Sequence, residues 1–214
     1  MKIGILGSGA VGQALAKGFI KHGYEVMIGT NNTEKHQELK ANTGGKAAIG
    51  TFDATAKSGE IIVLAVKGTA AESALKSAGI SNLKGKTVLD ATNPIADAPP
   101  VNGVIKFFTS LDESLMERLQ KFAPEANFVK AFSCIGNALM VNPDLGSAKP
   151  SMFICGNNAN AKKQAGVIIE KFGFETEDMG GAEAARAIEP LCILWCIPGF
   201  LKNDWMHGFK LLRK

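Results

Sequence analysis

The sequence predicts an α/β fold, built on a doubly wound parallel sheet with a short carboxyl-terminal helical segment. Short apolar runs rich in Val and Ile alternate along the chain with stretches of helical periodicity. The apolar runs are nearly continuous rather than alternating with polar residues, as expected of strands covered on both faces. After residue 180 the alternation stops and only a helical pattern continues.

Each element follows from its local pattern. The predicted strands, in chain order, are KIGILG, YEVMIG, KAAIG, EIIVLAV, TVLDAT, NFVKAF, SMFICG and FETEDMG. Stretches with helical periodicity separate them at residues 10–23, 33–44, 69–79, 112–123 and 160–173. Several of these stretches end on glycine, which favours the left-handed conformation that caps a helix.

The carboxyl-terminal part, residues 181–214, contains no further predicted strand. It is expected to be a helical tail that is interrupted at Pro198 and Gly199. The stretch from Ala182 to Trp195 is apolar enough to be buried. We therefore expect residues 1–180 to form the sheet domain, and the tail to pack on it or on a second subunit of a homodimer.

Composition narrows the possible classes of protein. The 214 residues are 46% apolar and 21% charged, which suits one soluble α/β domain with a sizeable core. The net charge of +4 is mild and no Lys/Arg block occurs, so nucleic acid is not an expected partner. Neither a signal peptide nor a run of about 18 uncharged apolar residues is visible, so we expect a cytoplasmic protein without a membrane partner.

The cysteines support the same compartment. Cys134, Cys155, Cys192 and Cys196 form no C-x-x-C pair and lack the spacing of metal ligands, so no metal site is expected. Cys192 and Cys196 are four residues apart in a predicted helix and share a face. Core packing is favoured over a redox pair there. Reduced thiols are typical of the cytoplasm.

A glycine motif predicts a ligand at the start of the chain. Residues 7–12, GSGAVG, follow a predicted strand and open a predicted helix. Gly7 permits the tight turn, Gly9 lets a pyrophosphate approach the backbone, and Gly12 lets helix and strand pack closely. The first amide groups of the helix then face the phosphates. A Rossmann dinucleotide site is favoured over a ligand-free turn.

The residues after the second strand indicate which dinucleotide binds. An NAD site usually has an acidic residue here, which binds the ribose 2′-hydroxyl. This chain has Thr30, Asn31 and Asn32 instead, with no carboxylate before Glu34 and with Lys35 one turn further on. Neutral donors and a nearby cation favour the 2′-phosphate of NADP(H). A second interpretation, compatible with the first, is that Asn32 or the following threonine caps a helix.

Other strand ends contribute to the same edge of the sheet, because ligands bind outside the carboxyl ends of parallel strands. Ala65 and Ala91 are small enough to let a cofactor lie close. Asn93 is expected to hydrogen-bond the nicotinamide ribose or amide, and Pro94 to fix the turn. For Asp90, a structural tie between loops and a functional role remain equally open.

Catalytic candidates are few. Reduction of a carbonyl needs a proton donor near the nicotinamide. Tyr24 and His22 lie at the opposite end of the predicted strands, which leaves Lys67, Lys130 and His207. An acceptor that takes hydride directly onto a conjugated ring, such as a flavin or deazaflavin, needs orientation more than an acid or base.

Several motifs together carry a family resemblance. They are IGILGSGAVGQALAKGF, VLAVK, VLDATNP, FVKAF, FICGNNANAKK, FGFETEDMG and ARAIEPL. In this order, and over nearly the whole chain, they resemble the NADPH:coenzyme F-420 oxidoreductases, which use a deazaflavin, and the cytoplasmic domains of six-transmembrane metalloreductases. The resemblance implies that NADP(H) lies over the phosphate loop, with a flavin or deazaflavin against the nicotinamide.

The resemblance also implies residue roles. Gly7, Ser8, Gly9, Ala10, Val11 and Gly12 would contact the phosphates, and Thr30, Asn31 and Lys35 the 2′-phosphate region. Ala65, Val66 and Lys67 would form the adenosine-side loop, Asn93 and Pro94 the nicotinamide side, and Ala131 and Phe132 the edge of the nicotinamide pocket. The family commonly has Ser-Arg where this chain has Thr30 and Asn31, so a guanidinium contact to NADP is lost.

Three functions follow as alternatives. The leading one is an NADP(H)-dependent oxidoreductase that passes hydride to a flavin-like acceptor. A second is an NADPH-dependent reductase of a small imine or carbonyl, with Lys130 or His207 as proton donor. A third is a non-catalytic NADP-binding redox sensor. Arg186 and Glu189, at helical spacing near the expected acceptor side, are interpreted as an ion pair within the helix or an interface rather than as a catalytic element.

Overall fold

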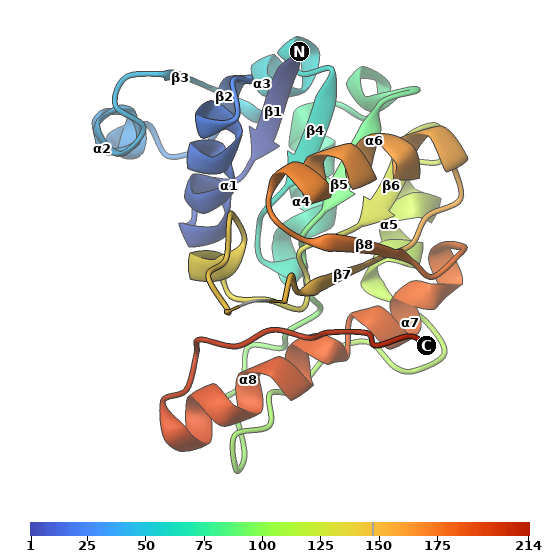
Figure 1. Cartoon of the computed structure of the whole chain (residues 1–214). Helices are drawn as coiled ribbons and strands as arrows, with labels where there is room; N and C mark the ends of the chain where they lie inside the picture. The colour runs from blue at the N-terminus through green and yellow to red at the C-terminus, as the bar shows by residue number, and fades with distance from the viewer. Residues whose placement is uncertain (147) are drawn as a thin grey trace.

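The computed structural model describes residues 1–146 and 148–214 and contains a six-stranded parallel sheet between two layers of helices (Figure 1). The strand order is β3-β2-β1-β4-β5-β6, so the chain starts in the middle of the sheet and winds outward in both directions. The strands are β1 (Lys2–Leu6), β2 (Glu25–Gly29), β3 (Ala47–Gly50), β4 (Ile61–Leu64), β5 (Thr87–Asp90) and β6 (Asn127–Lys130). The predicted α/β fold with a doubly wound parallel sheet is confirmed.

Helices cover both faces of this sheet, and each face has its own core. α1 and α6 pack on one face, where Phe19 and Ile168 are fully buried, and α3, α4 and α5 pack on the other, around Leu75 and Leu119. These two cores bury every residue of β4 and β5, which explains their continuous apolar runs. The helices are α1 (Ala10–Lys21), α2 (His36–Asn42), α3 (Phe52–Ser58), α4 (Ala71–Ala78), α5 (Leu115–Phe122) and α6 (Ala159–Lys171).

Helix α3 was not expected from the sequence. It has only seven residues, too few for its periodicity to stand out from the adjoining strands. Thr51 caps it by accepting a hydrogen bond from the amide of Ala54 at 3.2 Å. Gly4 lets it approach β1, because a Cβ on Gly4 would lie 2.6 Å from the carbonyl oxygen of Thr55.

The last two predicted strands form a separate sheet rather than extending the main one. β7 (Ser151–Ile154) and β8 (Glu175–Asp178) pair in parallel with each other, and β7 meets β6 only through an antiparallel bridge between Lys130 and Cys155. In its described residues, 131–146 and 148–150, the connection between β6 and β7 holds no crossover helix, only a 3₁₀ turn at Asn137–Leu139. A parallel neighbour needs such a crossover, so the chain instead returns in the opposite direction.

The carboxyl-terminal tail differs from the expectation in two ways. α7 (Ala185–Ile188) leads into α8 (Leu191–Lys202), which continues through Pro198 and Gly199 instead of being interrupted there. Pro198 sits late in the helix and removes a single amide donor. α8 ends at Asn203, which has the left-handed φ of +54°.

Beyond α8 the chain is extended rather than helical. Residues 203–214 run back along β7, where the amide of Ser151 donates to the carbonyl of Phe209 at 2.8 Å. The amide of Leu211 in turn donates to the Ser151 hydroxyl at 3.0 Å. This segment therefore covers the open edge of β7, and the carboxyl terminus lies beside α7 in Figure 1.

By length and apolar composition, one helical stretch in the described chain, Ala182–Lys202, is sufficient to cross a membrane, and 33% of its most apolar window is buried. In the fold this stretch is divided between α7 and α8. It also contains Glu189, which is 1% exposed and ion-paired with Lys130. A membrane-spanning arrangement would have to separate that buried pair, so the stretch is a packing element in this fold.

α7 is docked onto α5 by an ion pair that the sequence did not predict. The Arg186 guanidinium lies 2.6 Å from a carboxylate oxygen of Glu117, not beside Glu189. Glu117 also belongs to a capping box with Ser114 at the start of α5. The hydrogen bonds from Arg186, opposed by burial and aided by Ser114, lower the pKa of Glu117 from 4.5 to about 2.

This lowered pKa predicts acid sensitivity. A carboxylate whose pKa is depressed in the folded state stabilises the fold above its unfolded pKa of about 4.5, and the contribution is lost as the pH falls towards about 2. Between these values the unfolding free energy of the wild type should therefore fall more steeply than that of Glu117→Gln. Urea unfolding at a series of pH values measures the difference, and parallel curves would contradict the assignment.

Candidate functional site

The phosphate loop joins β1 to α1 with the geometry that its glycines predict. Gly7 has a φ of +124°, and its amide donates to the carbonyl of Gly29 at 3.1 Å, which ties the loop to the end of β2. A Cβ on Gly12 would overlap the Gly7 carbonyl, so α1 packs directly against the turn. A Cβ on Gly9 would meet no described atom within 4 Å. Gly9 thus leaves open the space that a pyrophosphate needs, at the amide end of α1.

At the end of β2, the structure shows the capping role that the sequence offered for Asn32. Thr30 is buried, and its hydroxyl accepts hydrogen bonds from the Ser8 hydroxyl at 3.0 Å and from the Asn32 amide at 3.1 Å. The Asn32 side chain caps the next turn by accepting from the amide of Glu34 at 2.9 Å. Thr30 therefore links the phosphate loop to the end of β2, while Asn31 and Lys35 are exposed at the rim.

A cavity of about 280 Å³ brings several of these strand ends together. It is lined by Val11, Val66, Lys67, Gly68, Ala91, Asn93, Ile95 and Asp97. The first helix of the Rossmann unit and the loops after β4 and β5 thus meet at one site, as the sequence predicted. Gly68, Ile95 and Asp97 were not foreseen. Gly68 could have been predicted, because a glycine shortly after a strand often permits the close approach of another backbone segment. A Cβ there would overlap the Asn93 carbonyl.

Asn93 presents an unpaired acceptor. Its side-chain amide donates to the Ser133 carbonyl at 2.7 Å, which fixes the carboxamide plane. The Oδ1 atom of Asn93 and the hydroxyl of Ser133 are both buried, and neither has a hydrogen-bond partner in the described chain. Buried polar atoms rarely stay unpaired. A ligand with an amide donor, such as nicotinamide, fits Asn93 Oδ1.

Ala131 and Phe132 do not edge the pocket as the resemblance implied. Both side chains are buried, and the Phe132 ring packs in the core with its centroid 5.9 Å from that of Phe172 and 6.3 Å from that of Phe174. Phe132 has a φ of +59°, an uncommon conformation that this core packing supports. Both residues are thus part of the core in this structure.

Lys130 is not a plausible proton donor. Its side chain is fully buried, and its ammonium lies 2.7 Å from Asp90 Oδ2, 2.9 Å from Glu189 Oε1 and 2.9 Å from the carbonyl oxygen of Thr92. Burial acts to lower the pKa of Lys130, but the two carboxylates outweigh it and raise the pKa above its usual value. The Lys130 proton is therefore held in the core. For Asp90, the structure shows the structural tie.

His207 is also placed away from the cavity. Its ring stacks on Trp195 at a centroid distance of 5.0 Å, and Nε2 lies 3.0 Å from the Trp195 carbonyl oxygen. It belongs to the extended segment after α8 and lines none of the cavities described here. Of the three proton-donor candidates, Lys67 is the one that lines the cavity, and its ammonium lies 3.9 Å from Asp97.

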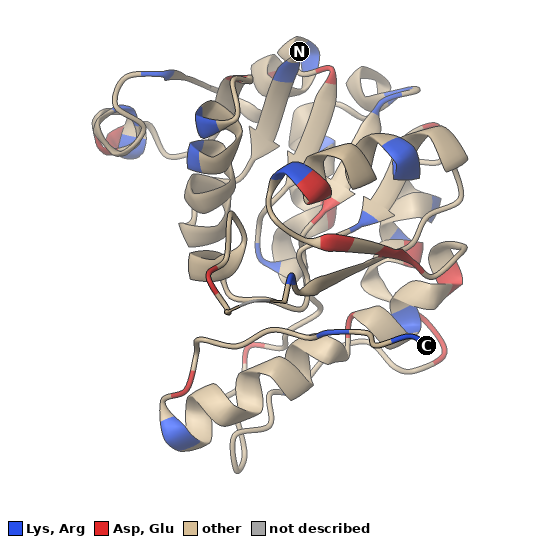
Figure 2. Ribbon diagram, in the orientation of Figure 1, with Lys and Arg blue, Asp and Glu red and all other residues tan. Residues whose placement is uncertain are grey.

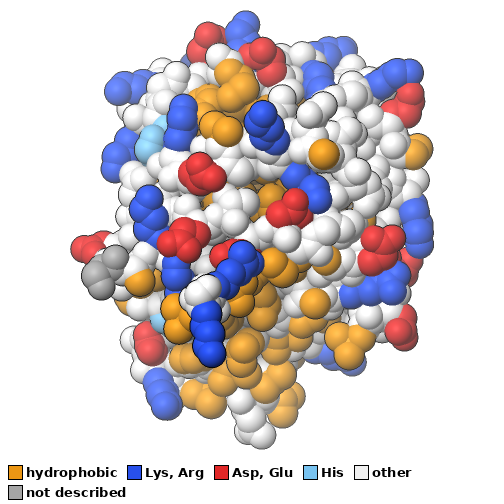
Figure 3. All heavy atoms as spheres, turned by 45° about the vertical axis from the view of Figure 1, so that its right-hand side comes forward, with side chains coloured by type: hydrophobic (Ala, Val, Ile, Leu, Met, Phe, Trp, Pro, Cys, Tyr) orange, Lys and Arg blue, Asp and Glu red, His pale blue; other side chains and the backbone are white. Residues whose placement is uncertain are grey.

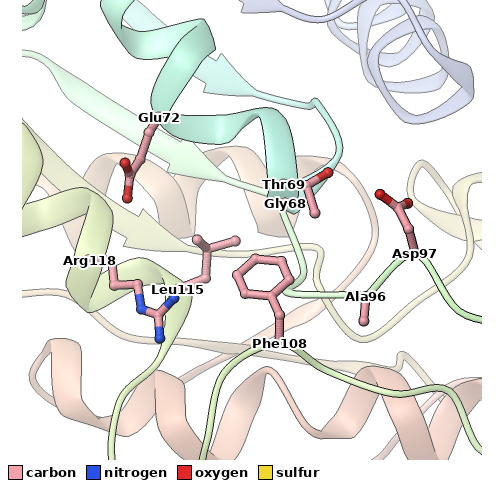
Figure 4. A pocket seen from close by; sticks show the side chains of 8 residues that line it. All are labelled: Gly68, Thr69, Glu72, Ala96, Asp97, Phe108, Leu115 and Arg118. Carbon is pink, nitrogen blue, oxygen red and sulfur yellow. The ribbon is translucent and has the colours of Figure 1, made fainter.

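A second cavity of about 400 Å³ adjoins the first, sharing Gly68 and Asp97 with it (Figure 4). Phe108 and Leu115 give it an apolar wall, and the Arg118 guanidinium lies 5.9 Å from the centre of the Phe108 ring. Thr69, Glu72 and Ala96 complete the lining. The second cavity has room for an aromatic ring beside the first.

Within the described residues, no cluster of three or more His, Cys, Asp or Glu side chains is arranged to hold a metal ion. The four cysteines are free thiols. Burial raises the pKa of Cys134 and of Cys155 to about 12, which makes both weak nucleophiles.

The sequence is similar to several known proteins. Residues 2–94 match the family described as NADP oxidoreductase coenzyme F420-dependent. The F420-dependent NADP reductase of Methanothermobacter thermautotrophicus is 28% identical over 205 residues, which cover 89% of this chain and 86% of that protein. Metalloreductase STEAP3 of Rattus norvegicus is 30% identical over 94% of this chain, but this chain spans only 39% of its length.

Solved structures agree with this relationship. A candidate F420-dependent NADP reductase from Arthrobacter sp. FB24 superposes over 100% of both chains, with a TM-score of 0.91 and 29% identity. An imine reductase from Aspergillus terreus, in complex with NADPH4, shares the fold at a TM-score of 0.66 and 18% identity, over 94% of this chain and 63% of that one. The chain is thus similar to F420-dependent NADP reductases over most of its length, and to a part of the metalloreductases.

Proposed function

We propose that this protein transfers hydride between NADP(H) and a flavin or deazaflavin acceptor, and that it catalyses the transfer mainly by positioning. The observation that carries the proposal is the pair of adjoining cavities. One joins the phosphate-loop helix to the unpaired Asn93 Oδ1, and the other has the aromatic wall of Phe108. Together they suit a nicotinamide beside a second ring.

Each part of the site has a role in this proposal. NADPH, when bound, supplies a hydride from its nicotinamide ring to the acceptor ring, which takes its proton from solvent. The loop around Gly9 binds the pyrophosphate, and Asn31 and Lys35 face the 2′-phosphate. Asn93 orients the carboxamide. The small side chain of Ala91 leaves space for the cofactor in the cavity. No protein group has to move a proton.

Turnover assays test the proposal. NADPH oxidation is measured with riboflavin, a 5-deazaflavin, a cyclic imine and an aldehyde as acceptors. We expect turnover with the flavin or the deazaflavin, because ring acceptors need no acid from the protein. Turnover restricted to the imine or the aldehyde would overturn the proposal. Tight NADPH binding without turnover of any acceptor would favour a redox sensor.

Imine reduction is kept as a second candidate because one titratable amine lines the cavity. Lys67 is 83% exposed in its side chain and is held only loosely beside Asp97. It has the reach and the proton that an imine would need. The variant Lys67→Met separates the two functions: it should abolish imine reduction but leave flavin reduction within a few-fold of the wild type.

We also propose a homodimer formed through the tail. α8 is apolar on all sides, with its one charge at Lys202, as the ribbon in Figure 2 shows. Its inner face packs through Trp195, whereas Leu194 and Leu201 on other faces are 55% and 58% exposed. Hydrophobic side chains gather around this region in Figure 3. A helix that is apolar all round is normally covered on every face.

A second copy can cover this surface, because one patch on α8 can pair with its twin about a two-fold axis. Sedimentation equilibrium is expected to give twice the chain mass, and Leu194→Lys should shift the protein to the monomer. A wild type that stays monomeric at micromolar concentration would contradict the dimer.

We further propose a cytoplasmic location, in keeping with the free thiols.

A further inference from the structure

We propose that Lys130 and Glu189 are positioning residues that hold Asn93 in place for the nicotinamide, and that they couple the carboxyl-terminal segment to the cofactor site. The inference rests on the proposed NADP(H) site. It assigns a role to the buried charged cluster of Asp90, Lys130 and Glu189, which takes no direct part in the proposed hydride transfer.

The cluster consists of Asp90, Lys130 and Glu189, and Asp90 directly precedes Ala91, which lines the first cavity. Asp90 and Lys130 are direct neighbours in the register of β5 and β6, at the carboxyl ends of both strands. The side chains of Asp90 and Lys130 are 0% exposed and that of Glu189 is 2% exposed. The Lys130 ammonium donates a hydrogen bond to the carbonyl oxygen of Thr92 and forms ion pairs with Asp90 and Glu189. A buried ammonium with three oxygen contacts is held more rigidly than an exposed one.

The cluster has two carboxylates and one ammonium, and the helix that Glu189 caps offsets the excess negative charge. The two carboxylate oxygens of Glu189 accept hydrogen bonds from the amides of Leu115 and Met116, both at 3.0 Å, at the start of α5. The positive end of the helix dipole adds to this stabilisation. Glu189 stands between α7 and α8 in the chain. The position of the tail is thus fixed to the end of β6 through one side chain.

The same cluster fixes the loop that carries Asn93. Asp90 Oδ1 accepts hydrogen bonds from the amide of Thr92 at 2.9 Å and from its hydroxyl at 2.6 Å. The carbonyl oxygen of Thr92 accepts from Lys130 at 2.9 Å. Thr92 is therefore held on both sides of its backbone, which sets the direction of the next residue, Asn93. Its remaining freedom is removed by the hydrogen bond to Ser133 at 2.7 Å.

Replacing Glu189 should therefore weaken the binding of the nicotinamide end of the cofactor but not the binding of the adenosine end. In Glu189→Gln the side-chain nitrogen cannot accept a hydrogen bond, and Lys130 loses one of its two negative partners. Lys130 and Thr92 can then shift, and the acceptor atom of Asn93 shifts with them. The phosphate loop and Thr30 follow β1 and β2, which β4 separates from β5 and β6 in the sheet.

Three ligands separate these effects in a binding experiment. NADP⁺ has the carboxamide N–H donor, its 3-acetylpyridine analogue replaces that amino group by methyl, and 2′,5′-ADP lacks the nicotinamide half altogether. Calorimetry on the wild type should show NADP⁺ binding about tenfold more tightly than the acetylpyridine analogue, as expected for one hydrogen bond. In Glu189→Gln this ratio should fall towards one, while the dissociation constant of 2′,5′-ADP stays within about twofold.

Arg186→Gln is the matched control. It breaks the neighbouring ion pair between the same segment and α5, but it does not touch Lys130. Its NADP⁺ to acetylpyridine ratio should equal that of the wild type. An equal loss in Arg186→Gln, or an unchanged ratio in Glu189→Gln, would overturn the inference and leave the cluster with a purely structural role.

Thr92→Val covers the case in which Glu189→Gln does not fold. It removes only the hydroxyl hydrogen bond to Asp90, and it should lower the ratio in the same direction. An unchanged ratio there would count against the inference. A wild type that binds neither NADP⁺ nor 2′,5′-ADP would instead refute the proposed function, so the two failures are distinguishable.

Discussion

A Gly9→Val variant is expected to fold as stably as the wild type and to bind NADPH at least about thirtyfold more weakly. Gly9 has extended backbone angles that any residue can adopt, and an added Cβ there would meet no described atom within 4 Å. The folded chain therefore tolerates valine, but the valine fills the space through which a pyrophosphate would approach α1. A thirtyfold loss corresponds to about 2 kcal/mol.

Gly12→Ala is the matched comparison, because it should lower the stability of the fold, whereas Gly9→Val should lower the affinity for NADPH. Its Cβ would overlap the Gly7 carbonyl, which α1 packs against, so this variant should be destabilised by about 1–3 kcal/mol. Thermal unfolding and NADPH titration of both variants check the pair. Wild-type NADPH affinity in a folded Gly9→Val protein would show that the cofactor does not cross this loop.

The second large effect is expected at the end of β2. Thr30→Asp should weaken NADPH binding by roughly tenfold or more and strengthen NADH binding, since a carboxylate there repels the 2′-phosphate and binds the ribose hydroxyls. The structure supports the substitution, because aspartate can also accept the hydrogen bonds that the Thr30 hydroxyl accepts from Ser8 and Asn32. Dissociation constants for NADPH and NADH measure the shift.

Thr30→Ser serves as its control. Serine keeps the hydroxyl and adds no charge, so the ratio of the two dissociation constants should stay close to that of the wild type. If Thr30→Asp left both constants unchanged, the adenosine end of the cofactor would have to lie elsewhere, and the role given to Asn31 and Lys35 would fall with it.

The parts of the site set by local backbone requirements were predictable from the sequence. Gly7, Gly9 and Gly12 are needed wherever a strand turns directly into a helix over a phosphate, so their roles could be assigned before the fold was known. The alternation of apolar runs and helical stretches likewise predicted the sheet. Asn93 could be placed because the carboxyl ends of parallel strands meet at one edge.

The parts set by long-range packing were not predictable. Glu189 meets Lys130 across 59 positions of sequence, and no local pattern marks such a pair. Phe132 was expected at the pocket edge, but its positive φ lets its ring pack in the core. A positive φ at a phenylalanine cannot be predicted from the residue type. The separate pairing of β7 and β8 depends on a connection without a helix, which apolar runs alone do not reveal.

Transfer of deuterium from [4-²H]NADPH to a 5-deazaflavin tests the central claim most directly. The carbon at position 5 of a reduced deazaflavin keeps the hydride it receives, so mass spectrometry of the product reports its origin. With each of the two 4-deuterated stereoisomers of NADPH tested in turn, we predict one deuterium in the product from one isomer and none from the other. No deuterium in the product with either isomer, together with NADPH-dependent turnover of the cyclic imine alone, would contradict hydride transfer to a ring acceptor.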